Sequence, residues 1–139
     1  MLKHGYDLRV QMETCGSFLL VLLQRRSKVG FTDEGKLLAL DLVIYNNAGN
    51  SLELSRGILE NAMYQSDNVY EIPNVRVNES VCFTDYPSTT AFRGFSEPQG
   101  MLITESWIQR VAMEVKKSPE EIREMNFISY GSILLCIDL

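Results

Sequence analysis

The stretch of sequence that decides the fold is Val29-Gly30-Phe31-Thr32-Asp33-Glu34-Gly35-Lys36-Leu37-Leu38-Ala39-Leu40-Asp41-Leu42-Val43-Ile44-Tyr45-Asn46. Its middle, residues 33–36, reads as a turn in which glycine supplies a positive φ, so residues 29–32 and 37–46 are predicted to pair as a β-hairpin. The second strand carries apolar side chains on both faces, and such strands are usually buried on both. One face holds Leu38, Leu40, Leu42 and Ile44, and the other holds Leu37, Ala39, Val43 and Tyr45 beside Asp41.

Helical and extended segments follow the hairpin. Residues 51–65 place apolar side chains at helical spacing, which predicts a helix. Because the residue before a proline avoids the helical region, residues 70–73 are predicted to be extended. Two short strands are then expected at residues 75–77 and 80–84, joined near 78–79.

The clearest helix prediction is Pro98–Lys117, where Met101, Ile108, Val111 and Val115 form an apolar stripe with Trp107 beside it. After it, Ser118-Pro119-Glu120-Glu121 reads as a capping box that opens a short helix to Met125. These elements predict an α+β fold, in which a hairpin-rich mixed sheet packs against helices.

Composition and charge limit the class of protein. The length of 139 residues suggests one domain. With 45% hydrophobic and 22% charged residues, the chain has the composition of a globular protein. A net charge of −5 lacks the basic footprint of nucleic-acid binding, so no nucleic-acid partner is expected.

The cysteines, the histidine and the most apolar run argue against a disulfide-rich, a zinc-binding or a membrane-spanning protein. The cysteines Cys15, Cys82 and Cys136 lie far apart, which predicts reduced, buried thiols instead of a disulfide framework or a zinc site. The single histidine, His4, lies at a terminus. The run Phe18–Leu23 is too short to cross a bilayer, which takes ~20 apolar residues, so we expect a buried strand or helical turn and no membrane partner.

The segment with the most chemical character is Thr90-Ala91-Phe92-Arg93-Gly94-Phe95-Ser96-Glu97-Pro98-Gln99-Gly100-Met101. It bends around Gly94 and enters a helix that Pro98 opens. The loop therefore brings backbone N–H groups and two phenylalanines to a helix N-terminus, where anions dock.

Five blocks of sequence occur in the same order as in a known family. They are Lys28–Thr32, Leu40–Asn50, Ser66–Val75, Thr89–Phe95 and Ser118–Phe127. On these blocks the chain resembles the xanthine dehydrogenase and aldehyde oxidase family of molybdenum hydroxylases, in its plant xanthine dehydrogenase form. The resemblance implies part of the first molybdopterin-binding domain.

The resemblance also divides the chain. It implies a divergent N-terminal segment at residues 1–27, a partial molybdopterin-binding domain at 28–134 and a divergent tail at 135–139. Molybdenum–molybdopterin is the cofactor it implies, whereas the iron–sulfur, FAD and NAD sites of the family are expected to be absent. The family's glutamate base lies outside the matching blocks, so no catalytic residue is assigned here.

Site residues follow by carrying the family's motif onto this chain. Phe95 corresponds to one of two rings that clamp a flat substrate, and Leu54 is a further substrate-binding candidate. The turn Phe92, Arg93 and Gly94 corresponds to the cofactor-binding backbone, in which a main-chain N–H at Arg93 lies near a molybdenum-bound oxygen.

Three positions depart from the family pattern. Ser96 and Glu97 stand where the family usually has two glycines, which strains the loop if either position needs a positive φ, and Glu97 adds negative charge near an anionic cofactor. Asn61, in Glu60-Asn61-Ala62, replaces an arginine that orients purines. Asn61 remains a substrate-binding candidate, and the loss of charge allows an aldehyde-like specificity.

Two kinds of function remain open. One is a fragment of an oxidoreductase that hydroxylates purines, other N-heterocycles or aldehydes and is inactive on its own. The other is a catalytically inert truncated relative, or a small interaction module that pairs with a full-length family member. Family members are homodimers, and the resemblance implies a cytoplasmic location with the peroxisome as an alternative.

Overall fold

The computed structural model of the chain describes residues 8–12 and 22–129, with side chains from residue 25 onward. Its elements, in chain order, are β1 (Leu8–Met12), β2 (Leu22–Phe31), β3 (Leu37–Gly49), α1 (Ser55–Tyr64), β4 (Asn74–Phe83), α2 (Glu97–Val115) and α3 (Pro119–Asn126).

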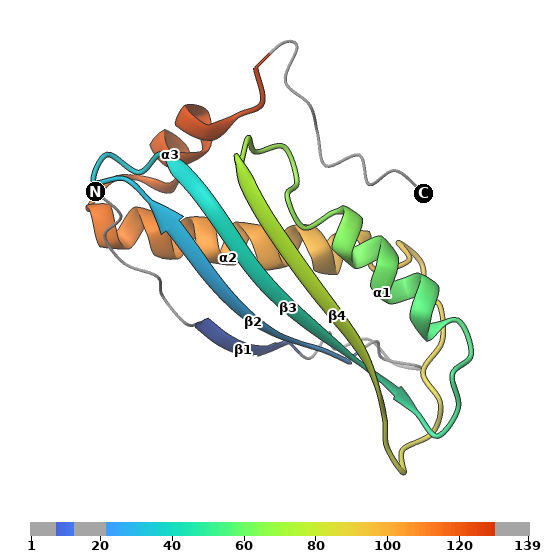
Figure 1. The fold of residues 1–139 in the computed structure, drawn as a ribbon. Helices are drawn as coiled ribbons and strands as arrows, with labels where there is room; N and C mark the ends of the chain where they lie inside the picture. Colours follow the sequence, from blue (N-terminus) through green and yellow to red (C-terminus); the bar gives the residue numbers. More distant parts are fainter. Residues whose placement is uncertain (1–7, 13–21, 130–139) are drawn as a thin grey trace.

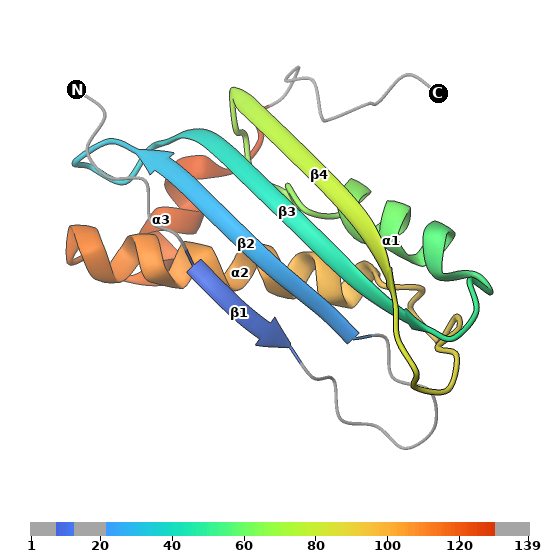
Figure 2. The ribbon, with the colours of Figure 1, turned by 60° about the horizontal axis from the view of Figure 1, so that its bottom comes forward.

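The strands form one mixed sheet in the order β1-β2-β3-β4. Neighbours β1, β2 and β3 pair antiparallel, whereas β4 pairs parallel to β3. A parallel pair needs a crossover connection, and α1 supplies it. The long helix α2 lies across one face of the sheet, with α1 and α3 on the same side (Figures 1 and 2). This confirms the predicted α+β fold with a hairpin-rich mixed sheet and packed helices.

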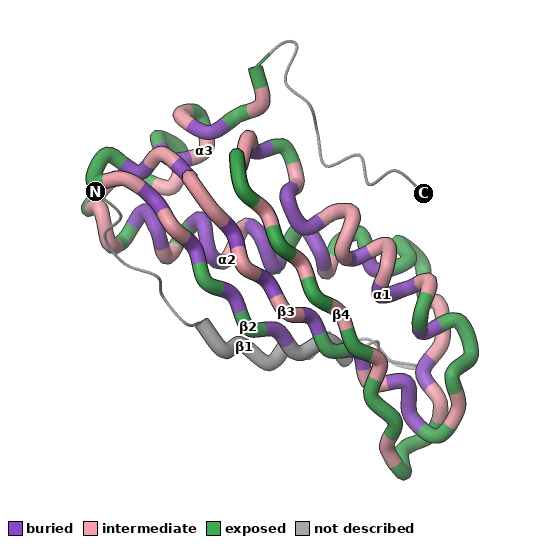
Figure 3. Tube along the Cα trace, viewed as in Figure 1, coloured by how far each residue is buried: buried purple, intermediate pink, exposed green. Residues whose placement is uncertain are grey.

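Strand β3 is buried on one face only, which corrects the expectation of burial on both. Leu40, Leu42 and Ile44 point into the core, whereas Ala39 and Val43 are half-buried and Tyr45 is exposed. The physical reason is that helices cover a single face of the sheet in the described part of the chain (Figure 3). The register shift opposite Gly30 and Phe31 lets Leu37 face inward as well.

Strand β4 is one continuous strand, where the sequence predicted two short ones. Its residues alternate between exposed and half-buried along most of its length, as expected at the edge of a sheet with one covered face. The half-buried Val75, Val77 and Val81 pack against the core. Cys82 is exposed, so the expectation of a buried thiol is wrong at this position.

Helix α2 confirms the helix predicted at residues 98–117, and its apolar face closes the core. Buried on it are Ile103, Trp107, Ile108 and Val111, whereas the predicted stripe member Met101 is exposed. The buried Arg25 of β2 donates to the carbonyl of Ile103 and to Ser106 Oγ, which joins the sheet to α2. Burial lowers the pKa of Arg25 to about 10.

The capping box of α3 is present as predicted. Ser118 Oγ accepts from the N–H of Glu121, and the Glu121 carboxylate accepts from the N–H of Ser118. These bonds lower the pKa of Glu121.

Some predictions concern residues that the structure does not describe. His4, Cys15 and Cys136 are among them, as is the run Phe18–Leu23 except for its last two residues, which begin β2. The division at residues 27 and 28 falls within β2, and it remains a prediction.

Candidate functional site

The loop between β4 and α2 makes a sharp left-handed turn. Gly94, Phe95 and Ser96 all have positive φ, at 90°, 41° and 71°. The N–H of Phe95 donates to the carbonyl of Phe92 at 2.9 Å, and the N–H of Glu97 donates to that of Gly94 at 2.8 Å. The bend predicted around Gly94 therefore extends over two further residues before α2 begins.

Phe95 is held by helix α1. Asn61 Nδ2 donates to the main-chain carbonyl of Phe95 at 2.7 Å. The ring of Phe95 lies against Gly57, where an added Cβ would be 3.4 Å from the ring. Phe95 as a residue nevertheless remains 37% exposed, so part of its surface is open to a ligand.

Leu54 lies on the same face of α1 as Gly57 and Asn61. Leu54, Gly57 and Asn61 are spaced i, i+3 and i+7, which places them on one side of α1. Leu54 occupies the N-terminal cap position of α1, and its side chain is exposed. The structure thus brings the predicted residues Asn61 and Phe95 together and sets Leu54 on the same face.

The predicted cofactor-binding turn is open to solvent. Phe92, Arg93 and Gly94 are all exposed. Within the part of the chain that the structure describes, the N–H groups of Arg93 and Gly94 donate to no main-chain carbonyl. The turn therefore presents unused donors beside the N-terminus of a 19-residue helix.

Ser96 has the left-handed backbone that the sequence analysis associated with glycine. It is buried, its side chain makes no capping bond to α2, and its Oγ has no hydrogen-bond partner among the residues that the structure describes. Glu97 is exposed in the first turn of α2, where the helix dipole favours a negative charge.

Helices α1 and α2 pack closely next to the loop of residues 92–97. A Cβ added at Gly100 would lie 2.6 Å from the carbonyl oxygen of Ala62. Only a residue without a side chain lets the two helices approach this closely. Gly100 also donates its N–H to the carbonyl of Ser96 at 3.0 Å.

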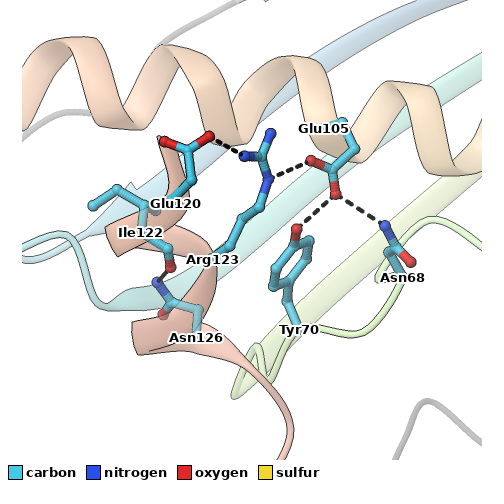
Figure 4. Close-up of polar contacts among 7 residues, drawn as sticks. All are labelled: Asn68, Tyr70, Glu105, Glu120, Ile122, Arg123 and Asn126. Atoms are coloured by element: carbon cyan, nitrogen blue, oxygen red, sulfur yellow. Dashed lines mark hydrogen bonds and ion pairs between the residues drawn. The ribbon is translucent and has the colours of Figure 1, made fainter. Parts of the chain in front are cut away.

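A second polar cluster, which the sequence analysis missed, lies farther along α2 (Figure 4). Glu105 accepts from Tyr70 Oη at 2.6 Å, from Asn68 Nδ2 at 3.1 Å and from Arg123 Nε at 2.9 Å. Burial, together with the bond to Glu105, raises the pKa of Tyr70. The contact with Glu105 also raises the pKa of Arg123. No local spacing links residues so far apart, so no sequence signal was available.

Glu79 on β4 carries a partly buried carboxylate. One of its oxygens, Oε2, is buried and has no hydrogen-bond partner within residues 22–129. Burial raises its pKa, the charge of Glu60 raises it further, and Arg56 lowers it.

Two classes of site are absent from the described residues. No three histidine, cysteine, aspartate or glutamate side chains there are grouped to hold a metal ion. No helix among them is long and apolar enough to cross a membrane.

The comparison with known families decides the class of domain. Residues 23–127 match the molybdopterin cofactor-binding domain. The chain belongs to this family. The predicted resemblance to molybdenum hydroxylases is thereby confirmed.

Plant xanthine dehydrogenases are highly similar relatives of this molybdopterin-binding domain. Xanthine dehydrogenase 1 of Arabidopsis thaliana is 71% identical over 106 residues, which are 76% of this chain and 8% of the relative. Xanthine dehydrogenase of Oryza sativa subsp. japonica is 67% identical over 131 residues, which are 92% of this chain and 9% of the relative. The chain thus spans less than a tenth of the length of these relatives.

Solved structures show the same fold. The aldehyde oxidoreductase of Desulfovibrio gigas superposes with a TM-score of 0.71 at 24% identity, over 82% of this chain and 13% of that one. The aldehyde oxidoreductase of Desulfovibrio desulfuricans gives a TM-score of 0.75 at 20% identity, over 81% of this chain and 12% of that one. The roles of Phe95, Asn61, Leu54 and the turn at 92–94 remain predictions.

Proposed function

We propose that this molybdopterin-binding domain forms one wall of the active site of a xanthine dehydrogenase-like oxidoreductase. The substrate would be a purine, another N-heterocycle or an aldehyde. The protein would be located inside the cell. The observation that carries the proposal is the loop of residues 92–97, which presents a partly exposed aromatic ring and unused backbone donors at one helix N-terminus.

The loop fits an anionic cofactor. Among the described residues, the N–H groups of Arg93 and Gly94 and the Oγ of Ser96 find no hydrogen-bond partner. These groups and the N-terminus of α2 all favour a negatively charged group. We therefore assign the main chain of residues 92–94 to holding molybdenum–molybdopterin. When bound, this group supplies the oxidation–reduction chemistry, which amino-acid side chains alone do not provide. Sites for iron–sulfur clusters, FAD and NAD would lie outside this chain.

The ring of Phe95 would orient the substrate. An aromatic face binds a flat ring through burial and offset stacking, which adds about 1 kcal/mol beyond the buried area. Gly57 and Asn61 fix this ring from behind, and Leu54 extends the apolar surface along α1. Together these residues orient a planar ligand beside the cofactor-binding turn.

On its own, the chain should not turn over xanthine. It spans less than a tenth of the plant xanthine dehydrogenases that it resembles. The glutamate base implied by the family lies outside the matching blocks, and the loss of a general base typically costs about 10²–10⁴-fold in rate.

A second candidate is an inert relative that does not hold the cofactor. The carboxylate of Glu97 and the left-handed Ser96 at the loop favour it, because the first repels an anion and the second strains the backbone. An interaction module that pairs with a full-length relative belongs to the same class.

Metal analysis distinguishes the two candidates. The chain, produced in a host that makes molybdopterin, should copurify with molybdenum. Gly94→Val should abolish this, because Gly94 has φ of 90° and an added Cβ would be 3.0 Å from Pro98. A third form, Glu97→Gln, removes the negative charge at the loop. If Glu97→Gln binds molybdenum and the unmodified chain does not, the inert candidate is correct. If neither Glu97→Gln nor the unmodified chain binds molybdenum, the cofactor proposal is wrong.

The substrate class needs a separate experiment. In a complete xanthine dehydrogenase that carries this segment, Asn61→Arg should raise kcat/KM for xanthine by an amount equivalent to a few kcal/mol, since it restores positive charge where the purine becomes anionic. Aldehyde turnover should not improve. Equal xanthine activity of both forms would refute a charge-stabilising role for this position.

A further inference from the structure

We propose that Asn61 is a positioning residue, which holds the ring of Phe95 in place through a hydrogen bond to the main chain of Phe95. The inference rests on the proposed ligand-binding role of Phe95. It assigns to Asn61 a task beyond direct substrate contact.

The first argument is the hydrogen bond itself. Asn61 Nδ2 lies 2.7 Å from the carbonyl oxygen of Phe95, a short contact for an amide donor. The bond joins residues 34 positions apart and connects α1 to the loop that enters α2. One end of the amide is thereby committed to the protein backbone.

The second argument is that the loop needs an external restraint. Phe95 and Ser96 are consecutive non-glycine residues with positive φ, and each such residue is disfavoured relative to ordinary backbone. The side chain of Ser96 adds no capping bond to α2. Such a backbone persists only where surrounding contacts determine it, and the amide of Asn61 is a contact of this kind.

The third argument is the geometry of helix α1. Gly57 lies one turn before Asn61 and leaves room for the Phe95 ring, since an added Cβ would be 3.4 Å from its tip. The two residues thus hold opposite ends of Phe95: Gly57 contacts the ring and Asn61 binds the carbonyl. Together they fix the ring's position relative to α1.

The test is amide hydrogen exchange in the unliganded 139-residue chain. Asn61→Asp keeps the size of the side chain but replaces the donor with an acceptor. We expect exchange of the Phe95 and Glu97 amides, which are bonded within the loop, to rise about tenfold, the effect of losing one hydrogen bond. Asn74→Asp at the start of β4 is the matched control. Asn74 Nδ2 also donates to a main-chain carbonyl, that of Leu38 on β3, at 2.9 Å.

A spectroscopic readout separates ring placement from general stability. Nuclear Overhauser contacts between the Phe95 ring and the Gly57 α-protons should weaken in Asn61→Asp and persist in Asn74→Asp. Asn61→Gln, which retains an amide donor, should restore part of the contact. If Asn61→Asp loses the whole fold, as judged by exchange of the Ile108 amide in α2, Asn61→Ala repeats both measurements without adding charge. Unchanged exchange and unchanged ring contacts in the folded donor-deficient variant would overturn the proposal.

Binding of a planar probe is measured separately. Xanthine should broaden the Phe95 ring signals of the chain, and Asn61→Asp should reduce this effect severalfold while Asn74→Asp does not. Absence of any xanthine effect in the unmodified chain would count against the proposed function. The exchange and ring-contact results would still decide whether Asn61 positions Phe95.

Discussion

The middle of α2 and its N-terminal entry differ in how their polar groups are satisfied. Around Glu105, the side chains of Asn68, Tyr70 and Arg123 all point at one carboxylate, and both of its oxygens are used. At the N-terminal entry, which is the loop of residues 92–97, the Oγ of Ser96 is buried without a partner in the described part of the chain, and Phe95 is partly exposed.

This difference separates a region built for stability from one suited to binding. Saturated polar networks make an arrangement rigid, whereas strained backbone and open donors occur where a ligand completes the site. Tyr70 also stacks on Phe127 at 5.9 Å between ring centroids and meets Trp107 edge-on, so the network rests on the core. The following predictions compare the two regions by stability measurements.

The largest effect should come from Asn126→Ala in α3, the helix that also carries Arg123 of the Glu105 cluster. The Asn126 side chain is fully buried, accepts from the N–H of Leu37 at 2.8 Å, and donates to the carbonyls of Gly35 and Ile122. Its removal leaves buried backbone groups unpaired, which should cost about 3 kcal/mol in the free energy of unfolding. Urea denaturation measures this, with the exposed Asn78→Ala on β4 as control. A loss no larger than the control's would mean that water replaces the amide.

Tyr70→Phe should cost less, about 1.5 kcal/mol, because it removes one hydrogen bond to a charged group and leaves the ring packing intact. Glu105 keeps its bonds to Asn68 and Arg123. The control is Tyr86→Phe, since Tyr86 is 68% exposed. Equal midpoints for the two variants in urea would show that the Glu105 cluster contributes nothing through Tyr70.

Glu79→Gln should stabilise the chain in a pH-dependent way. Since the pKa of Glu79 is raised in the folded state, its ionised form destabilises the fold, and wild-type stability falls as the pH rises above the unfolded value of about 4.3. The variant should therefore gain up to about 1 kcal/mol near neutral pH, where the partly buried carboxylate is charged, and nothing near pH 4. Thermal unfolding at both pH values measures the gain, and the exposed Glu124→Gln is the control. A gain that is the same at both values would contradict the charge argument.

Local patterns predicted most of the fold. Helices α2 and α3 followed from apolar spacing and from the Ser118 capping box, both of which depend on neighbouring residues alone. The one-sided burial of β3 was missed, because apolar side chains on both faces do not reveal which face the helices cover. The division of β4 into two strands failed because Asn78 and Glu79 are polar, although an edge strand tolerates polar residues.

The site was predicted only in part. The motif around Gly94 indicated which residues form the loop, and the positive φ of Ser96 matches the strain expected there. The bond between Asn61 and Phe95 was not predicted, since it depends on how α1 packs beside the loop. The Glu105 cluster was missed for the same reason, because its members come from three separate segments.

Ser96→Gly should have the smallest effect on the free energy of unfolding, and it should stabilise the chain, whereas Asn126→Ala and Tyr70→Phe destabilise it. At φ of 71°, a serine backbone is disfavoured by roughly 1–2 kcal/mol, and glycine removes this cost together with the unpartnered Oγ. The greater flexibility of glycine in the unfolded chain offsets part of the gain, which leaves about 0.5 kcal/mol of stabilisation. The same substitution at Ser118 is the matched control: that serine has an extended backbone and caps α3, so Ser118→Gly should lose a few tenths of a kcal/mol. Urea denaturation of the two variants compares two helix N-termini within one chain. Destabilisation by both would show that the Ser96 side chain supports the loop, and the N-terminal entry to α2 would then not be the strained region that its backbone indicates.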